Sequence, residues 1–471
     1  MHHIEQVYIN GEFVTPHGTE RFDLYNPATA RVIGQVRLAD AVDGERAIAA
    51  ARAAFPAWSK TTKQMRIAAL QRMHAAVAAR HDDLLEAVVE EYGAPASRSA
   101  WMASYPAEVI AQAIAALEAF DFTTVAGAAR VEMTPLCVAG LITPWNSDAG
   151  FICGKLAAAL AAGCTAVIKP SEMSALQTQI VTEALHAADL PPGVFNIVTG
   201  RGDTVGETIS RHPHVAKISF TGSTRTGKAI LRNAAENFTR VTLELGGKSP
   251  TLILDDADIK QAIPLAVQAG LMNSGQACVA GTRILVPQSR KAEFEQALAL
   301  AVAAVVSGDP RDAKTVVGPM VSERQWQRVQ GYIQKGLAEG ARLLAGGVGR
   351  PEGTRDGWFV RPTLFTDVHN QMAIARDEIF GPVLCVIAYR DEAEAIAIAN
   401  DTDYGLSALV LGGDSGRARR VAQQIQAGRV LVNTLTHEPK APFGGFKHSG
   451  VGREMGAWGI SAFMEPKSIL S

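Results

Sequence analysis

The sequence predicts an α/β protein with two doubly wound α/β domains and a small additional β element. Strand-like runs alternate with helical runs from residue 138 to 245, and the alternation begins again between residues 249 and 433. Such alternation is typical of a parallel sheet with helices on both faces. Two further β-favouring runs, at 121–138 and at the C-terminus, belong to neither series. A chain of 471 residues is long enough for two or three domains, each with its own core.

Composition and charge argue against several classes of protein. The net charge of −2 at pH 7 gives no basic excess for nucleic acid or an acidic membrane surface. The five cysteines are scattered without a CxxC pair, which argues against a disulfide framework and a zinc site and is typical of a reducing compartment. The N-terminus lacks a signal-peptide pattern, and no apolar run is long enough for a bilayer. We therefore expect a cytoplasmic protein that binds no nucleic acid, membrane or metal.

The first third of the chain is predicted to be mainly helical. Residues 41–58 and 64–93 carry apolar side chains at three- and four-residue spacing and are rich in Ala, Arg, Glu and Leu. The run at 121–138 is typical of a hairpin, and 461–470 resembles a terminal strand. Because an isolated hairpin is marginal in water, we expect this one to pack on another part of the protein or on a partner subunit.

Candidate site residues follow the strand-like runs of the first series, where open α/β sheets bind ligands. Asn146 follows VAGLITPW, Lys169 and Glu172 follow CTAVI, and Glu244 ends RVTLE. GSTRTG, residues 222–227, opens a helix whose N–H groups could approach an anion, although it is not the dinucleotide fingerprint and a plain turn fits equally well.

Each of these candidates has a structural alternative. Lys169 and Glu172 could bond ribose hydroxyls or belong to a solvated loop. Glu244 lies between two leucines, where its pKa would rise and it could accept a proton, but an edge-strand glutamate on a wet face fits the same pattern. The Asn146 amide could stabilise negative charge on an oxygen or belong to a turn.

Cys278 lies among small and polar neighbours in LMNSGQACVAGTR, residues 271–283. A structural cysteine behaves as a small hydrophobe and usually packs among large apolar side chains. Small neighbours leave space for a ligand beside the thiol, although a buried structural role is the alternative for any single cysteine.

Together these motifs resemble the NAD(P)-dependent aldehyde dehydrogenase superfamily. The resemblance covers essentially the whole chain, and seven motifs in family order carry it: PWN at Asn146, KPSE at Lys169, FTGSTRTG at Ser223, LELGGKSP at Glu244, GQAC at Cys278, EIFGPV at Glu378 and PFGGFKHSGVGRE near the C-terminus. Seven ordered motifs are far more specific than any one of them, so the structural alternatives lose most of their weight.

The resemblance implies catalytic roles for four residues. Cys278 would attack the aldehyde carbon, while the Asn146 amide and the Cys278 backbone N–H would hold the oxyanion. Hydride transfer to the nicotinamide would leave a thioester, and Glu244 would activate water to hydrolyse it to a carboxylic acid. Lys155 matches a lysine close to the oxyanion site. The small neighbours of Cys278 would let both the aldehyde and the nicotinamide ring reach the sulfur.

The resemblance also implies a cofactor site. The expected residues are Trp145, Lys169, Ser171, Glu172, Gly222, Ser223, Gly227, Glu378 and Phe380. Of these, Lys169 and Glu172 would hold the adenosine ribose, Ser223 the pyrophosphate, and Glu378 the nicotinamide ribose with Phe380 beside the ring. A glutamate at 172 should bond a 2′-hydroxyl and repel a 2′-phosphate. This predicts NAD as the cofactor, with NADP as an alternative because some relatives with this glutamate use both.

The sequence departs from the commonest family pattern where the substrate is expected. Residues 147–150 read SDAG where many relatives carry a bulky aromatic, and Gly154 replaces a frequent Trp. His437 and Glu438 precede PFGG and are expected near the tunnel. These changes predict a mouth that is wider and more polar than in enzymes for small aliphatic aldehydes, unless Phe151 or a neighbouring loop fills the space. The expected pocket residues are Ser147, Phe151, Gly154, Ala277, Val279 and His437, and they do not identify the aldehyde.

We therefore expect a non-acylating, NAD-dependent aldehyde dehydrogenase with three parts. Residues 1–118 and 139–247 would form the NAD-binding domain, 248–449 the catalytic domain, and 119–138 with 450–471 an oligomerisation element for a homodimer or homotetramer. One rival is a CoA-acylating semialdehyde dehydrogenase, against which Glu244 argues because acylating relatives commonly lack that base. The other is a non-catalytic structural protein on the same scaffold, which loss of a catalytic residue would favour.

Overall fold

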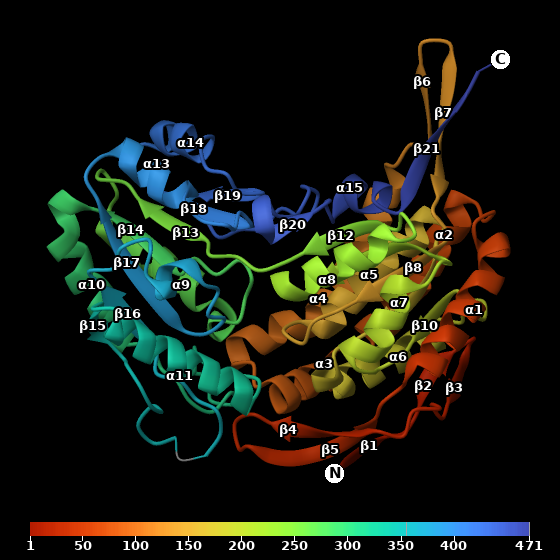
Figure 1. Cartoon of the computed structure of the whole chain (residues 1–471), viewed down its shortest axis with the longest axis horizontal. Helices are drawn as coiled ribbons and strands as arrows, with labels where there is room; N and C mark the ends of the chain where they lie inside the picture. The colour runs from red at the N-terminus through yellow and green to blue at the C-terminus, as the bar shows by residue number, and fades with distance from the viewer. Residues whose placement is uncertain (355, 471) are drawn as a thin grey trace.

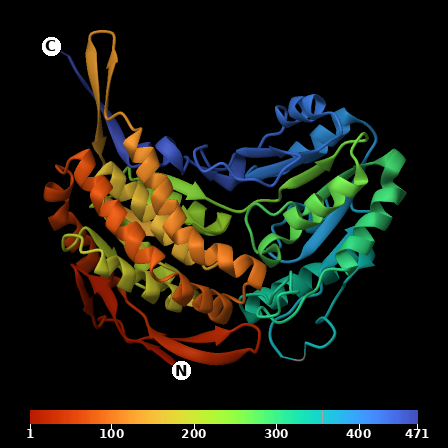
Figure 2. The same cartoon turned by 180° about the vertical axis from the view of Figure 1, so that it is seen from behind.

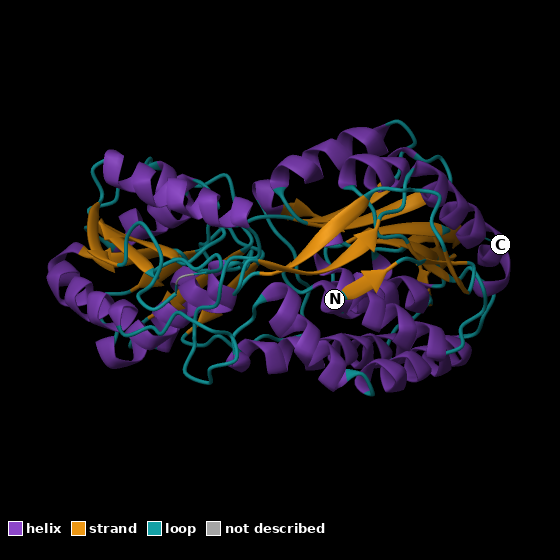
Figure 3. Cartoon of the chain, turned by 90° about the horizontal axis from the view of Figure 1, so that it is seen from below, coloured by secondary structure: helices purple, strands orange, loops and turns teal. Residues whose placement is uncertain are grey.

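Two large sheets of mainly parallel strands, each with helices on both faces, lie side by side in the computed structural model, which describes residues 1–354 and 356–470 (Figure 1, Figure 3). One of two small three-stranded sheets projects from one end of the molecule (Figure 2). The expected fold class, two doubly wound α/β units with a small β element, is confirmed.

The N-terminal segment contains strands that the prediction of a mainly helical first third omitted. They are β1 (His2–Ile4), β2 (Val7–Ile9), β3 (Glu12–Val14), β4 (Arg21–Asn26) and β5 (Arg31–Arg37). β1, β5 and β4 form a three-stranded sheet, whereas β2 and β3 extend the edge of the first large sheet. Three of the five strands have only three residues, which is too short for a period-two pattern to stand out in the sequence.

Four helices follow these strands: α1 (Ala41–Trp58), α2 (Lys63–Ala78), α3 (His81–Ala87) and α4 (Ala96–Glu118). Asp40 caps α1 in a capping box with Asp43, which satisfies backbone donors at the start of that helix. Helix α4 packs on α2 and α5, and its buried face belongs to the largest apolar core.

The first large sheet has eight strands. Its parallel strands are β8 (Val138–Ile142), β9 (Thr165–Lys169), β10 (Phe195–Ile197), β11 (Val215–Thr221) and β12 (Arg240–Glu244). The helices that connect them are α5 (Asp148–Ala162), α6 (Ala175–Ala187), α7 (Glu207–Arg211) and α8 (Thr224–Ala235). The strand order β12-β11-β8-β9-β10 reverses direction between β8 and β11. A crevice outside the carboxyl ends of the strands at such a switch point is where these sheets bind ligands.

The second large sheet has seven strands. They are β13 (Pro250–Ile253), β14 (Arg283–Pro287), β15 (Arg342–Ala345), β16 (Thr363–Thr366), β17 (Val383–Tyr389), β18 (Ser407–Leu411) and β19 (Arg429–Val432). The order is β15-β16-β17-β14-β13-β18-β19, and β15 pairs antiparallel with β16 while the other pairs are parallel. The helices are α9 (Ile259–Leu271), α10 (Lys291–Ala303), α11 (Glu323–Ala338), α12 (Ala373–Arg376), α13 (Glu392–Asn400) and α14 (Ser415–Ala422).

The projecting sheet contains the expected hairpin, β6 (Thr123–Ala126) and β7 (Ala129–Pro135), and the expected terminal strand, β21 (Met464–Ile469). All four residues of β6 are exposed, and the side chain of Val125 is 79% exposed. Two segments of the expected oligomerisation element lie in the main body instead: β20 (Gly450–Val451) pairs with β12, and α15 (Gly456–Ser461) packs on α4.

The described part of the chain contains neither a membrane-spanning helix nor a metal-binding cluster. None of these helices is both long and apolar enough to span a bilayer. No group of three or more His, Cys, Asp or Glu side chains in residues 1–354 and 356–470 is arranged to hold a metal ion.

Candidate active site

A cavity of about 420 Å³ is lined by residues of both large sheets and by helices α4 and α5. The four expected catalytic residues and the six expected pocket residues all line it: Asn146, Ser147, Phe151, Gly154, Lys155, Glu244, Ala277, Cys278, Val279 and His437. The fold therefore brings together side chains that are up to 291 positions apart (146 to 437) in the sequence.

The turn that leads to Cys278 has an unusual backbone. Asn273, Ser274 and Gly275 have φ values of 54°, 59° and 74°, so three consecutive residues adopt the left-handed conformation. Non-glycine residues visit this region rarely and at a cost, and such strain concentrates at functional sites. A Cβ atom on Gly275 would lie 2.2 Å from the Gly381 carbonyl oxygen, so the turn requires glycine there.

Gln276 anchors the same turn. Its buried side-chain amide donates to the Pro319 carbonyl at 3.3 Å and accepts from the Val321 N–H at 3.0 Å. Its backbone carbonyl accepts from Asn146 Nδ2 at 3.0 Å. The Asn146 side-chain amide, which is expected to stabilise an oxyanion, therefore contacts the backbone two residues before Cys278. Asn146 itself lies in the first turn after β8.

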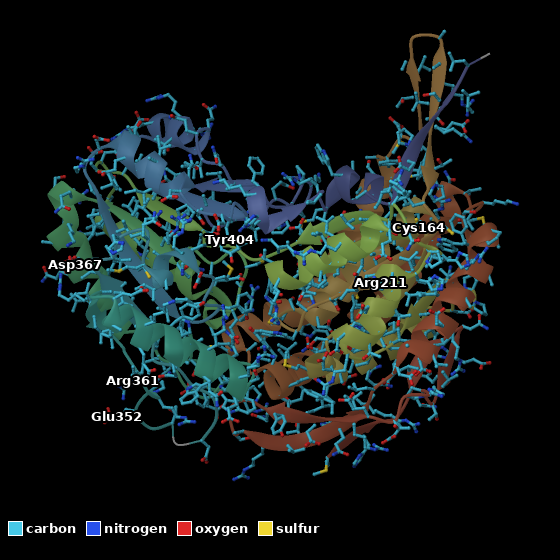
Figure 4. The ribbon with its side chains drawn as sticks, viewed as in Figure 1. Cys164, Arg211, Glu352, Arg361, Asp367 and Tyr404 are labelled. Carbon is cyan, nitrogen blue, oxygen red and sulfur yellow. The ribbon has the colours of Figure 1, made fainter. Side chains whose placement is uncertain are left out.

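The Cys278 thiol is half-buried and faces the cavity. Burial raises its pKa to about 12, and the charges of Glu378 and Glu244 act in the same direction, whereas Arg429 lowers it. The thiol is neutral at physiological pH, so its proton must be removed when the sulfur reacts. Cys164, which Figure 4 labels near the base of the projecting sheet, is fully buried and its Sγ contacts the Phe463 carbonyl at 3.3 Å.

Glu244 ends strand β12, opposite Thr221 of β11, and its side chain is buried. Neither carboxylate oxygen has a hydrogen-bond partner among the described residues. Burial raises the Glu244 pKa well above its ordinary value, and the Glu454 charge adds to the shift, while Lys155 and Arg453 oppose it. A buried carboxyl without partners is suited to accept and release a proton near neutral pH.

Lys155 is a buried lysine of α5 that is paired with a residue the sequence analysis did not assign. Its Nζ lies 2.5 Å from Glu454 Oε1 and donates to Ser219 Oγ at 2.9 Å. Glu454 is the last residue of the quoted GVGRE motif, so a signal for it was present.

Helix α4 forms part of the cavity wall, which the sequence analysis did not predict. Arg98, Trp101, Tyr105 and Val109 line the cavity from this helix. The Trp101 and Tyr105 rings stack at 4.3 Å, and a Cβ atom on Gly150 would lie 2.5 Å from Tyr105 Cδ1. The spacing of three or four residues places these side chains on one helix face, and this periodicity is the signal that could have identified them.

The same helix, α4, explains why the expected pocket position 154 carries no bulky side chain. A Cβ atom on Gly154 would lie 3.6 Å from Val109, so the site has room for a small side chain but not for an indole. Phe151 lines the cavity and is half-buried, which leaves part of the mouth apolar.

The expected adenosine-ribose residues lie at the carboxyl end of β9 and carry paired charges. The Lys169 ammonium is buried and lies 3.7 Å from Glu172 Oε2. Arg201 donates to Glu172 Oε1 at 3.2 Å and to Glu20 Oε1 at 2.7 Å. Burial lowers the pKa of Lys169, and the Glu172 charge opposes that shift. Arg201 was not predicted as part of this group.

The expected phosphate residues lie at the start of α8. Ser223 is the N-cap of that helix, and its hydroxyl accepts from the Thr226 N–H at 3.2 Å. A Cβ atom on Gly227 would lie 2.6 Å from Leu245, so glycine allows the helix to pack closely on the strand end. Gly222 precedes the cap, and Ser171 caps a short 3₁₀ turn, Glu172–Ser174, in the same way. A helix N-terminus at this edge is a favourable place for an anion.

The expected nicotinamide-side residues, Glu378 and Phe380, both lie just before strand β17 of the second large sheet. Glu378 Oε1 accepts from the Gly247 N–H at 3.2 Å, and burial raises its pKa to about 7. A Cβ atom on Gly246 would lie 2.2 Å from Glu378 Oε2, so glycine is needed for this approach. The Phe380 and Trp145 rings meet edge to face at 5.4 Å.

This arrangement can carry out acyl chemistry at Cys278. The cavity holds a thiol, an amide donor anchored beside it, a carboxyl free to exchange a proton and a buried lysine. These are the parts of a nucleophilic mechanism with an oxyanion site and a general base.

Comparisons with known proteins agree with the geometry. The model of the aldehyde dehydrogenase family matches residues 13–469. The 3-succinoylsemialdehyde-pyridine dehydrogenase of a Pseudomonas species is 43% identical over 472 residues, which cover 100% of this chain and 99% of that protein. A mutant of aldehyde dehydrogenase C from Pseudomonas syringae, solved with NAD⁺ and octanal, has a TM-score of 0.97 and 45% identity, over 99% of this chain and 96% of that one.

A third relative has the same fold along its whole length. The aldehyde dehydrogenase of Mycobacterium tuberculosis, solved with NAD⁺, has a TM-score of 0.96 and 39% identity, over 100% of this chain and 98% of that one. A family model across nearly the whole chain, and relatives well above 30% identity, leave one conclusion. The chain belongs to the aldehyde dehydrogenase family.

Proposed function

We propose that this enzyme oxidises an aldehyde to a free carboxylic acid with NAD through covalent catalysis at Cys278. The single observation that carries this proposal is the convergence of Cys278, Asn146, Glu244 and Lys155 on one cavity between the two sheets. The solved relatives from Pseudomonas syringae and Mycobacterium tuberculosis hold NAD⁺, which supports the same cofactor here.

The residues at the edge of the first sheet fit NAD. Glu172 offers carboxylate oxygens to ribose hydroxyls, Lys169 offers a donor, and the N-terminus of α8 at Ser223 offers N–H groups to the pyrophosphate. Glu378 offers a buried acceptor to the second ribose, where Gly246 leaves room for the carboxylate. When bound, NAD supplies the acceptor for the hydride that leaves the substrate carbon.

The protein's own residues account for the remaining steps. The Cys278 sulfur bonds to the carbonyl carbon, its proton passes to a base, and the carbonyl oxygen becomes an oxyanion. Asn146 Nδ2 leaves its bond to the Gln276 carbonyl and donates to that oxyanion, together with the Cys278 N–H. After the hydride has left, Glu244 removes a proton from water, the water oxygen bonds to the acyl carbon, and the carbon–sulfur bond breaks to release the acid.

Trapping the acyl enzyme tests this function. In Glu244→Gln, incubation with an aldehyde and NAD should yield one NADH per active site and a mass increase equal to the acyl group on the peptide that contains Cys278. An NADH burst without an adduct on that peptide would overturn the assignment of the nucleophile.

The rival that transfers the acyl group to CoA is tested by omission. Glu244 is present, buried and without a partner in the described residues, which supports water as the acceptor. Aldehyde oxidation should therefore proceed at full rate without CoA. An absolute requirement for CoA would replace this proposal with the acylating one.

The projecting sheet supports a homodimer or a homotetramer. Its strand β6 is exposed along its whole length, and exposed strands with apolar side chains such as Val125 seldom remain uncovered. Light scattering at micromolar concentration should give a mass of two or four chains, and a monodisperse monomer would contradict this.

A cytoplasmic location is proposed from the cysteines. All five are free thiols in the structure, and the catalytic chemistry requires Cys278 to stay reduced. Cell fractionation that recovered the enzyme outside the cytoplasm would contradict this location.

A further inference from the structure

The cavity contains three guanidinium groups that form no ion pair with a carboxylate of the described residues: Arg453, which donates to two backbone carbonyls, and the pair Arg98 and Arg429. Arg98 enters from helix α4 and Arg429 from strand β19, so the two large units each contribute one. In residues 1–354 and 356–470 neither arginine forms an ion pair. The inference drawn from them rests on the proposed function, because it concerns the aldehyde that this cavity selects.

Arg98 has unused hydrogen-bonding capacity. Its Nε is buried without a hydrogen-bond partner in the described residues, while its guanidinium stacks 3.7 Å from the centroid of the Trp101 ring. Two other largely buried arginines are satisfied differently. Arg66 donates to three backbone carbonyls and to the Thr61 hydroxyl, and Arg283 donates to three carbonyls and to the Asn370 amide. A buried donor without an acceptor costs free energy. Because no described protein group accepts from Arg98 Nε, a ligand or a water molecule is required there.

Arg429 is held by neutral groups. Its Nε donates to Ser407 Oγ at 3.2 Å, and its Nη1 lies 3.5 Å from His437 Nδ1. Burial lowers the pKa of His437, and the Arg429 charge lowers it further, so the imidazole is neutral and can accept. The guanidinium carbon lies 5.7 Å from the Phe443 ring centroid. These contacts fix the position of the guanidinium and leave its positive charge uncompensated.

The other charges in the cavity do not compensate the two arginines. Lys155 is paired with Glu454, and Arg453 donates to the carbonyls of Gly445 and Gly452. Glu244 is the remaining cavity carboxyl, and its raised pKa favours the neutral form. The cavity therefore has an excess of positive charge in a partly desolvated space, where an anion is attracted more strongly than in water.

We propose that this cavity selects aldehydes that carry a carboxylate at the far end of the chain, ω-oxo acids, and that Arg429 and Arg98 bind that carboxylate. A guanidinium matches a carboxylate with two parallel N–H donors, which a plain alkanal cannot use. Apolar side chains line much of the same cavity and suit the methylene groups of such a substrate. They include Trp101, Tyr105, Phe151, Leu431 and Leu435.

The first test uses the unmodified enzyme. We would measure kcat/KM with NAD for ω-oxo acids of four to nine carbons and for the methyl ester of each acid, which has nearly the same shape without the charge. The best acid should exceed its ester by about 10- to 100-fold, the range expected when a charge-assisted hydrogen bond is lost. Esters used as well as acids at every length would overturn the inference while leaving aldehyde oxidation intact. Oxidation of neither series would overturn the proposed function itself.

The second test assigns the selectivity to the arginines. Arg429→Met and Arg98→Met should each reduce the acid-to-ester ratio of kcat/KM by about tenfold or more. The ratio cancels any common effect on Cys278, whose pKa the Arg429 charge also influences. Arg429→Lys keeps the charge but loses the planar fork, so it should give an intermediate ratio even if the methionine variant folds poorly. Arg324→Met, on the exposed face of α11, is the matched control and should keep the wild-type ratio. An unchanged ratio in both cavity variants would overturn the assignment.

Discussion

The edge of the first large sheet that is expected to bind the cofactor, here called the cofactor edge, differs from the catalytic cavity in the pairing of its charged groups. At the cofactor edge, Glu172 is shared between Lys169 and Arg201, so each charge already has a partner before any ligand binds. In the cavity, Glu244 has no hydrogen-bond partner in the described residues. A paired group is held in one position, whereas an unpaired buried group has a shifted pKa and reacts readily. Under the proposed function, cofactor recognition would therefore rest on charges that are already paired, and the chemistry on a buried carboxyl without a hydrogen-bond partner.

The largest effect should come from removing the nucleophile. Cys278→Ala should reduce kcat by more than about 10⁴-fold, because no other group in the cavity can form the thioester. The Kd for NAD, measured by fluorescence titration, should stay within about twofold of wild type because the paired charges are untouched. Cys137→Ala, a half-buried thiol outside the cavity, is the matched control. Substantial turnover without Cys278 would show that the reaction does not depend on the cavity thiol, and the contrast between a binding region and a reactive region would no longer hold.

The next effect should appear in Glu244→Gln. Steady-state kcat should fall by about 10²- to 10⁴-fold, since general base catalysis contributes that much, while the first turnover still releases NADH. Rapid-quench and stopped-flow measurements separate the burst from the steady state. Full steady turnover in this variant would show that another group activates the water.

The pH profile gives a second measure of the same carboxyl. Burial raises the Glu244 pKa, so the active carboxylate is lost as pH falls and is gained as pH rises through the shifted value. When hydrolysis limits the rate, kcat of the wild type should therefore rise with pH at values well above the ordinary titration range of a glutamate, and the Gln variant should lose that limb. A wild-type kcat that reached its plateau within the ordinary titration range of a glutamate would contradict the shifted pKa as the source of reactivity.

A smaller effect is expected at the oxyanion donor. Asn146→Asp keeps the shape of the side chain and replaces its N–H₂ with an oxygen, so kcat should fall by about 10²- to 10³-fold. The turn that carries Cys278 would also lose the contact with the Gln276 carbonyl, and thermal unfolding reports whether that matters for stability. A kcat within threefold of wild type would exclude the Asn146 amide as the donor.

The sequence allowed the reactive groups to be predicted more completely than their surroundings. Cys278, Asn146, Glu244 and Lys155 lie in short motifs, and the structure brings them to one cavity. Arg98 and Trp101 come from a helix whose lining face carries no family motif, so only their helical spacing could have suggested them. The left-handed turn at 273–275 was not predicted, because its conformation depends on contacts with the segment before β17, such as the approach of Gly275 to Gly381.

The fold likewise contains some elements that could be predicted from the sequence and others that could not. Long parallel strands with continuous apolar runs, such as β11 and β17, were predictable because burial on both faces leaves a plain signal. The short N-terminal strands were not, since β2 and β3 depend on pairing with the edge of the sheet at β10 rather than on a pattern of their own. The pairing of Glu172 with Arg201 was missed for a related reason, because the two residues meet only through the order of the strands.

Loss of the ion pair between Glu172 and Arg201 should have the smallest effect. Glu172→Gln should weaken NAD binding by about tenfold, since a charged acceptor for the ribose hydroxyls becomes a neutral one, and should raise the NADP to NAD ratio of kcat/KM. Glu20→Gln is the matched control, because Glu20 also accepts from Arg201 but is more exposed than Glu172. If the two variants weakened NAD binding equally, the effect would come from a misplaced Arg201 and not from a contact of Glu172 with the cofactor. If only the Glu172 variant weakened NAD binding, and kcat at saturating NAD stayed nearly unchanged, the paired charges of this edge would act in binding. The unpaired carboxyl of the cavity would then be the group that acts in the reaction.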